Sequence, residues 1–326
     1  MAASGRSWVD AFANEATPGG VRYDQILTGA ADQQKLRSVV GILTGVLLFF
    51  FGASLVSQLL GGLGWLLLSP GGDFADWLRA LSRFDNPWGM LSGHLALATL
   101  IPISFGVVLF VHHRRPRWLG SVRPWFRWRY LLLSMLLALV LFNLVLFVQH
   151  LGASFPTLQP QADYWVFLVV ILLTSPLQAA AEEFFVRGYL LQAFQTLVPR
   201  TPWFGVVCSA LLFALFHGTQ NLPLFLDRFA FGLLAGALVV RTGGLEAAIG
   251  AHVVNNLMAF SYAGLYSTIA EVKATQTIGW IDLVWDLAGF GLFTLLAIVL
   301  GRRLQLDVTT PEPRTPERRR RRRKRR

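Results

Sequence analysis

Residues 180–190 have the sequence AAEEFFVRGYL, which places Glu182, Glu183 and Arg187 inside a run that otherwise predicts a lipid-buried helix. Residues 164–181 before it carry no charge, and a membrane-spanning helix needs about 20 predominantly apolar residues. A charged side chain at the centre of such a helix costs about 2.5–3.5 kcal/mol on insertion scales. The two glutamates must therefore be neutralised by partners or take part in chemistry.

The spacing of these residues predicts different roles for the two glutamates. Glu183 and Arg187 are four positions apart on one helical face and can form an ion pair. Glu182 lies about 100° further round the helix, so we expect it to have no partner within its own helix. An unpaired carboxyl group is suited to proton transfer. The alternative is a structural ion cluster that holds helices together, but the second glutamate favours chemistry.

The composition indicates an all-α polytopic membrane protein. Of the 326 residues, 54% are hydrophobic and only 14% are charged, whereas about 25% charged is usual for a soluble protein. The net charge of +11 would suggest a nucleic-acid ligand in a soluble protein. Here the basic residues lie between and beyond apolar runs, so membrane topology explains them better. The single cysteine, Cys208, excludes an intramolecular disulfide and a metal site built from several cysteines.

The chain contains eight apolar runs, which predict about eight transmembrane helices in one membrane domain over residues 38–301. A cytoplasmic segment, residues 1–37, precedes this domain, and a basic tail, residues 302–326, follows it. Because glycine pairs punctuate residues 61–72, we expect the part from residue 61 to 86 to be an extramembrane loop with an interfacial segment. The predicted spans are residues 38–60, 90–111, 130–150, 164–197, 203–217, 222–240, 245–265 and 278–300.

The basic residues predict the orientation. Eight spans put both termini on one side of the membrane, and that side would hold most of the 29 lysines and arginines. The opposite side would hold Arg79, Arg83 and Lys273. Cytoplasmic loops are the ones enriched in basic residues, so we expect cytoplasmic N- and C-termini in a bacterial cell membrane. We also expect a polar cavity that opens towards the cytoplasmic half.

The last nine residues, Arg318–Arg326, are all basic and follow a proline-rich linker. Such a segment is too highly charged to fold alone and is expected to be disordered. Anionic lipid headgroups are the ligand that we expect for it, in preference to RNA or a protein partner.

Two later runs carry polar residues that we expect to meet Glu182. If the chain turns near residue 199, Glu182 and His217 are about equally far from the turn, so a hairpin would place them at similar depth. His252 and Asn256 are four positions apart, share a helical face and can donate hydrogen bonds, whereas Asn255 points elsewhere. Taken singly, each of these residues is better explained as an interhelical hydrogen-bonding residue, because membrane helices often use His and Asn in this way. Asp227, Arg228 and Glu246 are expected to have structural roles only, the first two as a local pair.

Taken together, Glu-Glu-x-x-x-Arg, Phe-x-x-x-His and His-x-x-x-Asn follow one another on successive predicted helices. This pattern resembles the CPBP intramembrane proteases, the family of the type II CAAX prenyl endopeptidases and of bacterial proteins linked to bacteriocin processing and immunity. The resemblance covers a motif core of residues 164–262. It implies an intramembrane endopeptidase in which Glu182 and His217 activate water. His252 and Asn256 would stabilise the oxyanion, while Glu183 and Arg187 would brace the site.

The sequence leaves the cofactor and two other functions open. Glu182, His217 and His252 could provide three ligands of a zinc ion, but no His-Glu-x-x-His motif occurs and we favour a metal-independent mechanism. A proton-coupled transporter could use Glu182 and His217 as a relay. A non-catalytic immunity or scaffold protein could keep the same fold. For an enzyme, the expected substrate is a membrane-associated protein or peptide, with no evidence for a prenyl pocket.

Overall fold

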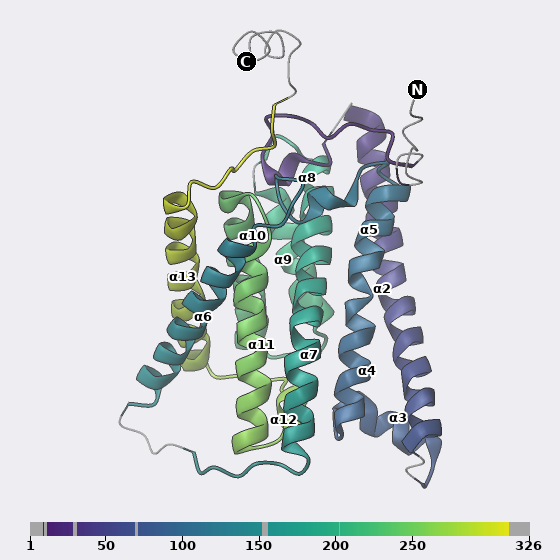
Figure 1. Cartoon of the computed structure of the whole chain (residues 1–326), viewed down its shortest axis with the longest axis vertical. Coiled ribbons are helices and arrows are strands. Elements are labelled where there is room, and N and C mark those ends of the chain that lie inside the picture. Colours follow the sequence, from purple (N-terminus) through teal and green to yellow (C-terminus); the bar gives the residue numbers. More distant parts are fainter. Residues whose placement is uncertain are drawn as a thin grey trace, which may run out of the picture.

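The computed structural model describes residue 9 and residues 12–28, 31–68, 71–151, 156–201 and 203–312, and in these residues the chain forms helices and two isolated β-bridges (Figure 1). The basic tail predicted at Arg318–Arg326 lies outside the described residues. The helices are α2 (Ala31–Leu68), α3 (Phe74–Arg83), α4 (Pro87–Ala98), α5 (Leu100–Phe110), α6 (Trp128–Gln149), α7 (Tyr164–Glu183), α8 (Leu191–Leu197), α9 (Phe204–Phe216), α10 (Leu222–Thr242), α11 (Glu246–Tyr266), α12 (Ile269–Ala274) and α13 (Trp280–Arg303), with the short turns η1 (Tyr23–Gln25), η2 (Pro116–Leu119) and η3 (Phe184–Leu190).

All eight predicted spans are helical, which confirms an all-α polytopic membrane protein. In the described part of the chain, six spans are long and apolar enough to cross a membrane. The helix α9 has only 13 residues, and α11 has the length but is not among the six. The predicted count of eight crossings is therefore not confirmed. The six spans are Gln33–Leu68, Pro87–Phe110, Trp128–Gln149, Tyr164–Leu197, Leu222–Thr242 and Trp280–Arg303.

The prediction that the first helix ends before the glycine pair at 61–62 is wrong, because α2 runs on to Leu68. Gly61 and Gly64 are contact points rather than breaks, whereas Gly62 faces open space. A Cβ on Gly64 would lie 2.2 Å from the indole nitrogen of Trp88, so only glycine lets that ring lie against the helix. The Trp88 indole also donates a hydrogen bond to the Leu60 carbonyl at 2.8 Å. Part of the stretch that we expected to be an extramembrane loop with an interfacial segment forms the helix α3.

The bundle has two distinct ends (Figure 1). The η1 end carries η1, η2, α8 and the C-terminal ends of α10 and α13, and the α12 end carries α3 and α12. The two ends of the described chain meet at the η1 end, where Arg22 and Thr309 form an antiparallel bridge. This arrangement fits an even number of crossings. The arginine-rich segment between α5 and α6 lies at the η1 end as well.

The helix α7 positions the glutamates at the centre of the molecule, where it packs against α4 on one side and α11 on the other. Directly after Glu183, the helix widens into a π-helical turn, η3, before continuing as α8. Single π-helical turns are rare and are frequently found at functional sites. No feature of the sequence predicted this one. Arg187 lies within it and is completely buried.

A tight hairpin between α8 and α9 sets the position of His217. A Cβ on Gly205 would lie 2.3 Å from the Leu191 carbonyl oxygen, so glycine is needed for the two helices to approach this closely. Gln195 closes the hairpin: its amide accepts from the Gly205 N–H at 3.0 Å and donates to the Thr201 carbonyl at 2.8 Å. Because α9 returns alongside α8 and η3, its C-terminal residues approach the glutamates at the end of α7.

Candidate active site

A cavity of about 450 Å³ lies among α4, α7, α9, α10 and α11, and all four residues predicted to be catalytic line it. They are Glu182, His217, His252 and Asn256, and they come from three helices or their ends. Apolar residues such as Leu97 surround them. The cavity reaches the α12 end of the bundle, where its lining includes Phe84, Val272, Lys273, Ala274, Thr275 and Gln276.

The shortness of α9 makes room for this cavity. Thirteen residues of α-helix rise about 20 Å, which is less than the ~30 Å hydrocarbon core of a bilayer. After α9 the chain is non-helical through residues 217–221, and His217 and Thr219 line the cavity. Irregular backbone at membrane depth is tolerated where it lines a polar cavity or is buried in protein. The Gln220 side chain donates to the Ala214 carbonyl at 2.7 Å and so satisfies one acceptor at the end of α9.

The predicted ion pair between Glu183 and Arg187 is confirmed. Arg187 Nη1 lies 2.9 Å from Glu183 Oε1, and both side chains are completely buried. The guanidinium group also lies over two aromatic rings, with its central carbon 4.2 Å from the centroid of Phe213 and 5.1 Å from that of Phe231. Such cation–π contacts stabilise a desolvated cation. The pair therefore ties η3 to α9 and α10 behind the cavity.

His252 connects the two glutamates. Its Nδ1 lies 2.8 Å from Glu183 Oε1, and its Nε2 lies 3.5 Å from Glu182 Oε2. An ionised carboxylate only accepts hydrogen bonds, so Nδ1 carries the proton that it donates to Glu183. In the neutral ring, Nε2 is then an acceptor. His252 can therefore donate to a substrate oxyanion only when both ring nitrogens are protonated.

Glu182 has a partner in its own helix, so our expectation that it has none is wrong. Gln178, one helical turn earlier, donates to Glu182 Oε1 at 2.5 Å and accepts from Asn256 Nδ2 at 2.8 Å. Sequence reasoning missed Gln178 because it considered only charged partners. The signal was present: an amide four positions before the glutamate, on the same face of an otherwise apolar helix. This amide fixes Glu182 and Asn256 relative to each other.

His217 is held in one tautomer by the end of α9. Its Nδ1 lies 2.7 Å from the Phe213 carbonyl oxygen, which can only accept, so Nδ1 carries the proton. Nε2 of the neutral ring is left as an acceptor on a side chain that lines the cavity. An orienting carbonyl on the far nitrogen is the arrangement that a histidine acting as a base requires.

The alternative zinc site is not assembled in this geometry. Among the described residues, no three histidine, cysteine, aspartate or glutamate side chains are gathered closely enough to hold a metal ion. The Nδ1 atoms of His217 and His252 are engaged by Phe213 and Glu183, so only the Nε2 atoms could face a metal ion. As they are arranged in this structure, Glu182, His217 and His252 do not form a three-ligand metal site.

Of the expected local pair of Asp227 and Arg228, only a charge interaction is found, because no direct ion-pair contact joins the two side chains among the described residues. Successive helical positions point about 100° apart. Arg228 instead donates to Gln220 Oε1 at 2.7 Å and lines the cavity, as does Lys273. Neither cation was considered for the site on sequence grounds. Asn255 points away, as expected, into a separate cavity of about 300 Å³.

The lining of the cavity reaches the α12 end of the bundle, whereas the described chain ends meet at the η1 end. Figure 1 shows that these are opposite ends of the bundle. The sequence analysis expected cytoplasmic termini and a cavity opening towards the cytoplasm. These two expectations cannot both hold, because the cavity reaches the α12 end whereas the chain ends meet at the η1 end. The prediction failed because depth along a helix says nothing about which end of a bundle is hollow.

The fold and the cavity define a polytopic helical membrane protein with a glutamate–histidine centre inside the bundle. Residues 163–258 match the family model of the Rce1-like type II CAAX prenyl endopeptidases. The matched segment is an Rce1-like domain, and it contains Glu182, Glu183, Arg187, His217, His252 and Asn256.

Two curated relatives are similar over part of their length. The uncharacterized protein YyaK of Bacillus subtilis (strain 168) is 29% identical over 145 residues, covering 42% of this chain and 48% of the relative. An uncharacterized 24.3 kDa protein of Escherichia coli is 33% identical over 84 residues, covering 26% of this chain and 37% of the relative. The matches thus span about half or less of these relatives. No solved structure matches the chain.

Proposed function

We propose that the protein is an intramembrane endopeptidase that hydrolyses a peptide bond of a membrane-associated protein or peptide. The observation that carries this proposal is that the Glu182 carboxylate and an accepting nitrogen of His217 line one polar cavity inside an apolar bundle. Both atoms can take a proton from water, and the Rce1-like family is a family of peptidases. Intramembrane ionisable residues of this kind mark functional sites.

The contacts suggest how the work is divided during hydrolysis. Glu182 accepts from Gln178 through Oε1, so Oε2 can take a proton from the attacking water. The water oxygen bonds to the carbonyl carbon, and the proton passes to the leaving amine as the carbon–nitrogen bond breaks. His217 Nε2 accepts a hydrogen bond from the same water and shares in this transfer. Glu183 and Arg187 do not contact the substrate and hold His252 in place.

Asn256 and His252 would stabilise the oxyanion. One N–H of the Asn256 amide donates to Gln178, which leaves the other for the developing charge. His252 adds a second donor once both of its nitrogens are protonated, with Nδ1 still held by Glu183. Donors aimed at the developing charge in this way are worth about 10²–10³-fold in rate each.

The cleavage reaction is tested with purified protein in detergent and a quenched fluorescent apolar peptide. We expect wild type to cleave it and Glu182→Gln to lose about 10²–10⁴-fold in rate, because the variant keeps the side chain's shape but not its proton acceptor. The melting temperature of Glu182→Gln should stay near that of wild type. Asp76→Asn, which changes an exposed carboxylate on α3, is the matched control and should cleave normally.

The other outcomes separate the competing functions. A proton-coupled transporter predicts no cleavage by wild type and loss of pH-driven flux in Glu182→Gln. A scaffold predicts neither activity. Full peptidase activity in Glu182→Gln would refute the assigned role of this residue.

We further propose that the η1 end is cytoplasmic, so that the cavity admits substrate from the opposite side of the membrane. The arginine-rich segment, with Arg117 exposed, is at the η1 end, and cytoplasmic loops are the ones enriched in arginine. In intact cells with Cys208→Ser, an impermeant maleimide should label Thr275→Cys at the cavity mouth and spare Arg117→Cys. The reverse labelling would invert the orientation.

A further inference from the structure

We infer that Arg228 and Lys273 form an anion subsite in the cavity that binds a carboxylate group of the peptide substrate. The inference rests on the proposed peptidase function and adds the chemical class of group that the substrate must present. It concerns residues outside the catalytic set, and Lys273 lies beyond the matched family domain.

One nitrogen of the Arg228 guanidinium group is fixed by a hydrogen bond, and the rest of the group can contact a ligand. Its Nη1 donates to Gln220 Oε1 at 2.7 Å, and the Gln220 amide is fixed in turn by the Ala214 carbonyl at the end of α9. Gln220 is neutral, so this contact orients the cation without cancelling its charge. Within the described part of the chain, no carboxylate forms an ion pair with Arg228, and Asp227 does not line the cavity.

Lys273 brings a second cation to the same cavity from α12. Its ammonium nitrogen lies 4.9 Å from the ring centroid of Phe84, and in the described residues it has no ion-pair partner. Desolvation lowers the pKa of Lys273, the Glu182 carboxylate opposes this, and the Arg228 charge adds to it. The charges of Glu182 and Arg228 therefore both act on Lys273, and they act in opposite directions.

The segment after Lys273 is fixed to the start of α10. The Asn221 N–H donates to the Gln276 carbonyl at 2.8 Å, and its side chain donates to the Ile278 carbonyl at 2.9 Å. Asn221 also caps α10, the helix that carries Arg228. The two cations are thus mounted on elements that are tied together, which is what a preformed binding subsite requires.

The charges of the cavity indicate an anionic ligand. Arg187 pairs with Glu183, and Arg228 and Lys273 add two further positive charges to the lining of the cavity. The charge of Asp227 acts on Arg228, but Asp227 does not line the cavity. Two like charges in one cavity repel, and a carboxylate beside both would remove that repulsion through charge-assisted hydrogen bonds. A peptide offers this group at its C-terminus or on an acidic side chain.

The test measures peptide binding to Glu182→Gln, in which turnover does not interfere. Three apolar peptides of one sequence, labelled at the N-terminus, carry a free C-terminal carboxylate, a C-terminal amide, or the amide with one added glutamate. By fluorescence anisotropy in detergent, we expect at least one carboxylate peptide to bind about tenfold or more tightly than the plain amide. Adding Arg228→Gln or Lys273→Gln should abolish this preference, and Lys273→Arg should keep it.

The matched control is Arg79→Gln, a cation on α3 at the same end of the bundle that does not line the cavity; it should keep the preference. Equal binding of all three peptides to Glu182→Gln would overturn the subsite. An equal loss of affinity for the acid and amide peptides in Arg228→Gln would also overturn the subsite, because it would show that Arg228 has only a structural role. Competition by inorganic phosphate but not by acetate would overturn the assignment to a carboxylate.

The subsite and the peptidase function can fail separately. Cleavage by wild type without any carboxylate preference would overturn the subsite alone. A carboxylate preference in binding, with no cleavage of any peptide, would support the subsite and overturn the peptidase.

Discussion

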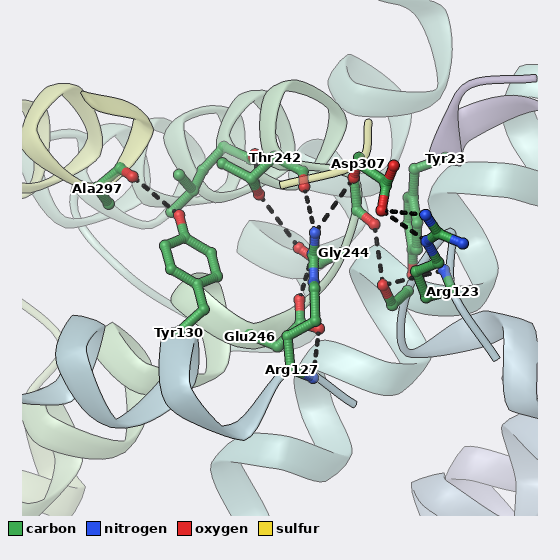
Figure 2. A network of polar contacts seen from close by, with 12 residues as sticks. Tyr23, Arg123, Arg127, Tyr130, Thr242, Gly244, Glu246, Ala297 and Asp307 are labelled. Carbon is green, nitrogen blue, oxygen red and sulfur yellow. Dashed lines mark hydrogen bonds and ion pairs between the residues drawn. The ribbon is translucent and has the colours of Figure 1, made fainter. Parts of the chain in front are cut away.

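Among the described residues, two buried glutamate–arginine pairs can be compared, one at the η1 end and one behind the cavity. They differ in how completely their hydrogen bonds are made. At the η1 end, Glu246 accepts from the Arg127 backbone N–H at 3.1 Å, from its Nε at 2.8 Å and from its Nη2 at 2.6 Å (Figure 2). Arg127 Nη1 donates to the carbonyls of Thr242 and Asp307. Both oxygens of the glutamate are used.

The pair behind the cavity is far less complete. Arg187 donates to Glu183 through Nη1 alone, and its Nε and Nη2, like Glu183 Oε2, have no hydrogen-bond partner among the described residues. Aromatic faces surround the guanidinium instead of acceptors. A buried pair that only holds helices together gains by satisfying its polar atoms, and each of the three guanidinium nitrogens of Arg127 has an acceptor. A pair whose glutamate also holds His252 is constrained by the position of that ring.

Of the changes to these two ion pairs, Glu183→Gln is expected to have the largest effect on stability. The change leaves Arg187 as a completely buried cation without a counter-charge, and breaking a buried pair in this way costs about 3–5 kcal/mol. We expect a lower melting temperature and a lower yield than for wild type or for Glu182→Gln, measured in the same detergent. A stable Glu183→Gln beside an unstable Glu182→Gln would mean that the two carboxylates have each other's roles.

The sequence predicted the parts of the site that depend on helical spacing. The Glu183–Arg187 pair follows from a four-residue separation, and the common cavity of Glu182 and His217 follows from similar distances to one turn. Both arguments need only the rise and period of a helix. The same reasoning placed His252 and Asn256 on one face, and both line the cavity.

The remainder depends on packing that a linear pattern does not contain. Gln178 is neutral and gave no charge signal, although it joins Glu182 to Asn256. Gly64 was expected to lie in a break after the first helix, but it lies within the helix, and the Trp88 ring occupies the space beside it. Arg228 was assigned to its sequence neighbour, although its hydrogen-bond partner, Gln220, lies outside the helix.

The second prediction concerns the Glu246–Arg127 pair at the η1 end, whose hydrogen bonds are more complete. Glu246→Gln removes the charge that faces Arg127, but the amide oxygen can still accept one of its hydrogen bonds, and the Thr242 and Asp307 carbonyls stay in place. We expect a loss of about 1–3 kcal/mol, which is smaller than for Glu183→Gln. Peptide cleavage should be unchanged in rate per folded molecule. A loss of stability as large as that of Glu183→Gln would show that the additional hydrogen bonds of Arg127 do not reduce the cost of removing its counter-charge.

The smallest effect is expected at the exposed edge of the same network, where Arg123 Nε donates to Asp307 Oδ2 at 2.6 Å (Figure 2). These side chains are 31% and 49% exposed, so water competes for both partners and salt screens them. Exposed ion pairs contribute about 0.2–1 kcal/mol. We therefore expect Arg123→Gln to lower the melting temperature only slightly at low salt and not measurably at high salt. Because Arg127 binds the Asp307 backbone rather than its carboxylate, the buried part of the network should stay intact. A salt-independent loss as large as that of Glu246→Gln would instead show that Arg123 holds the whole segment after α13 in place, and that the saturated network unfolds as one unit.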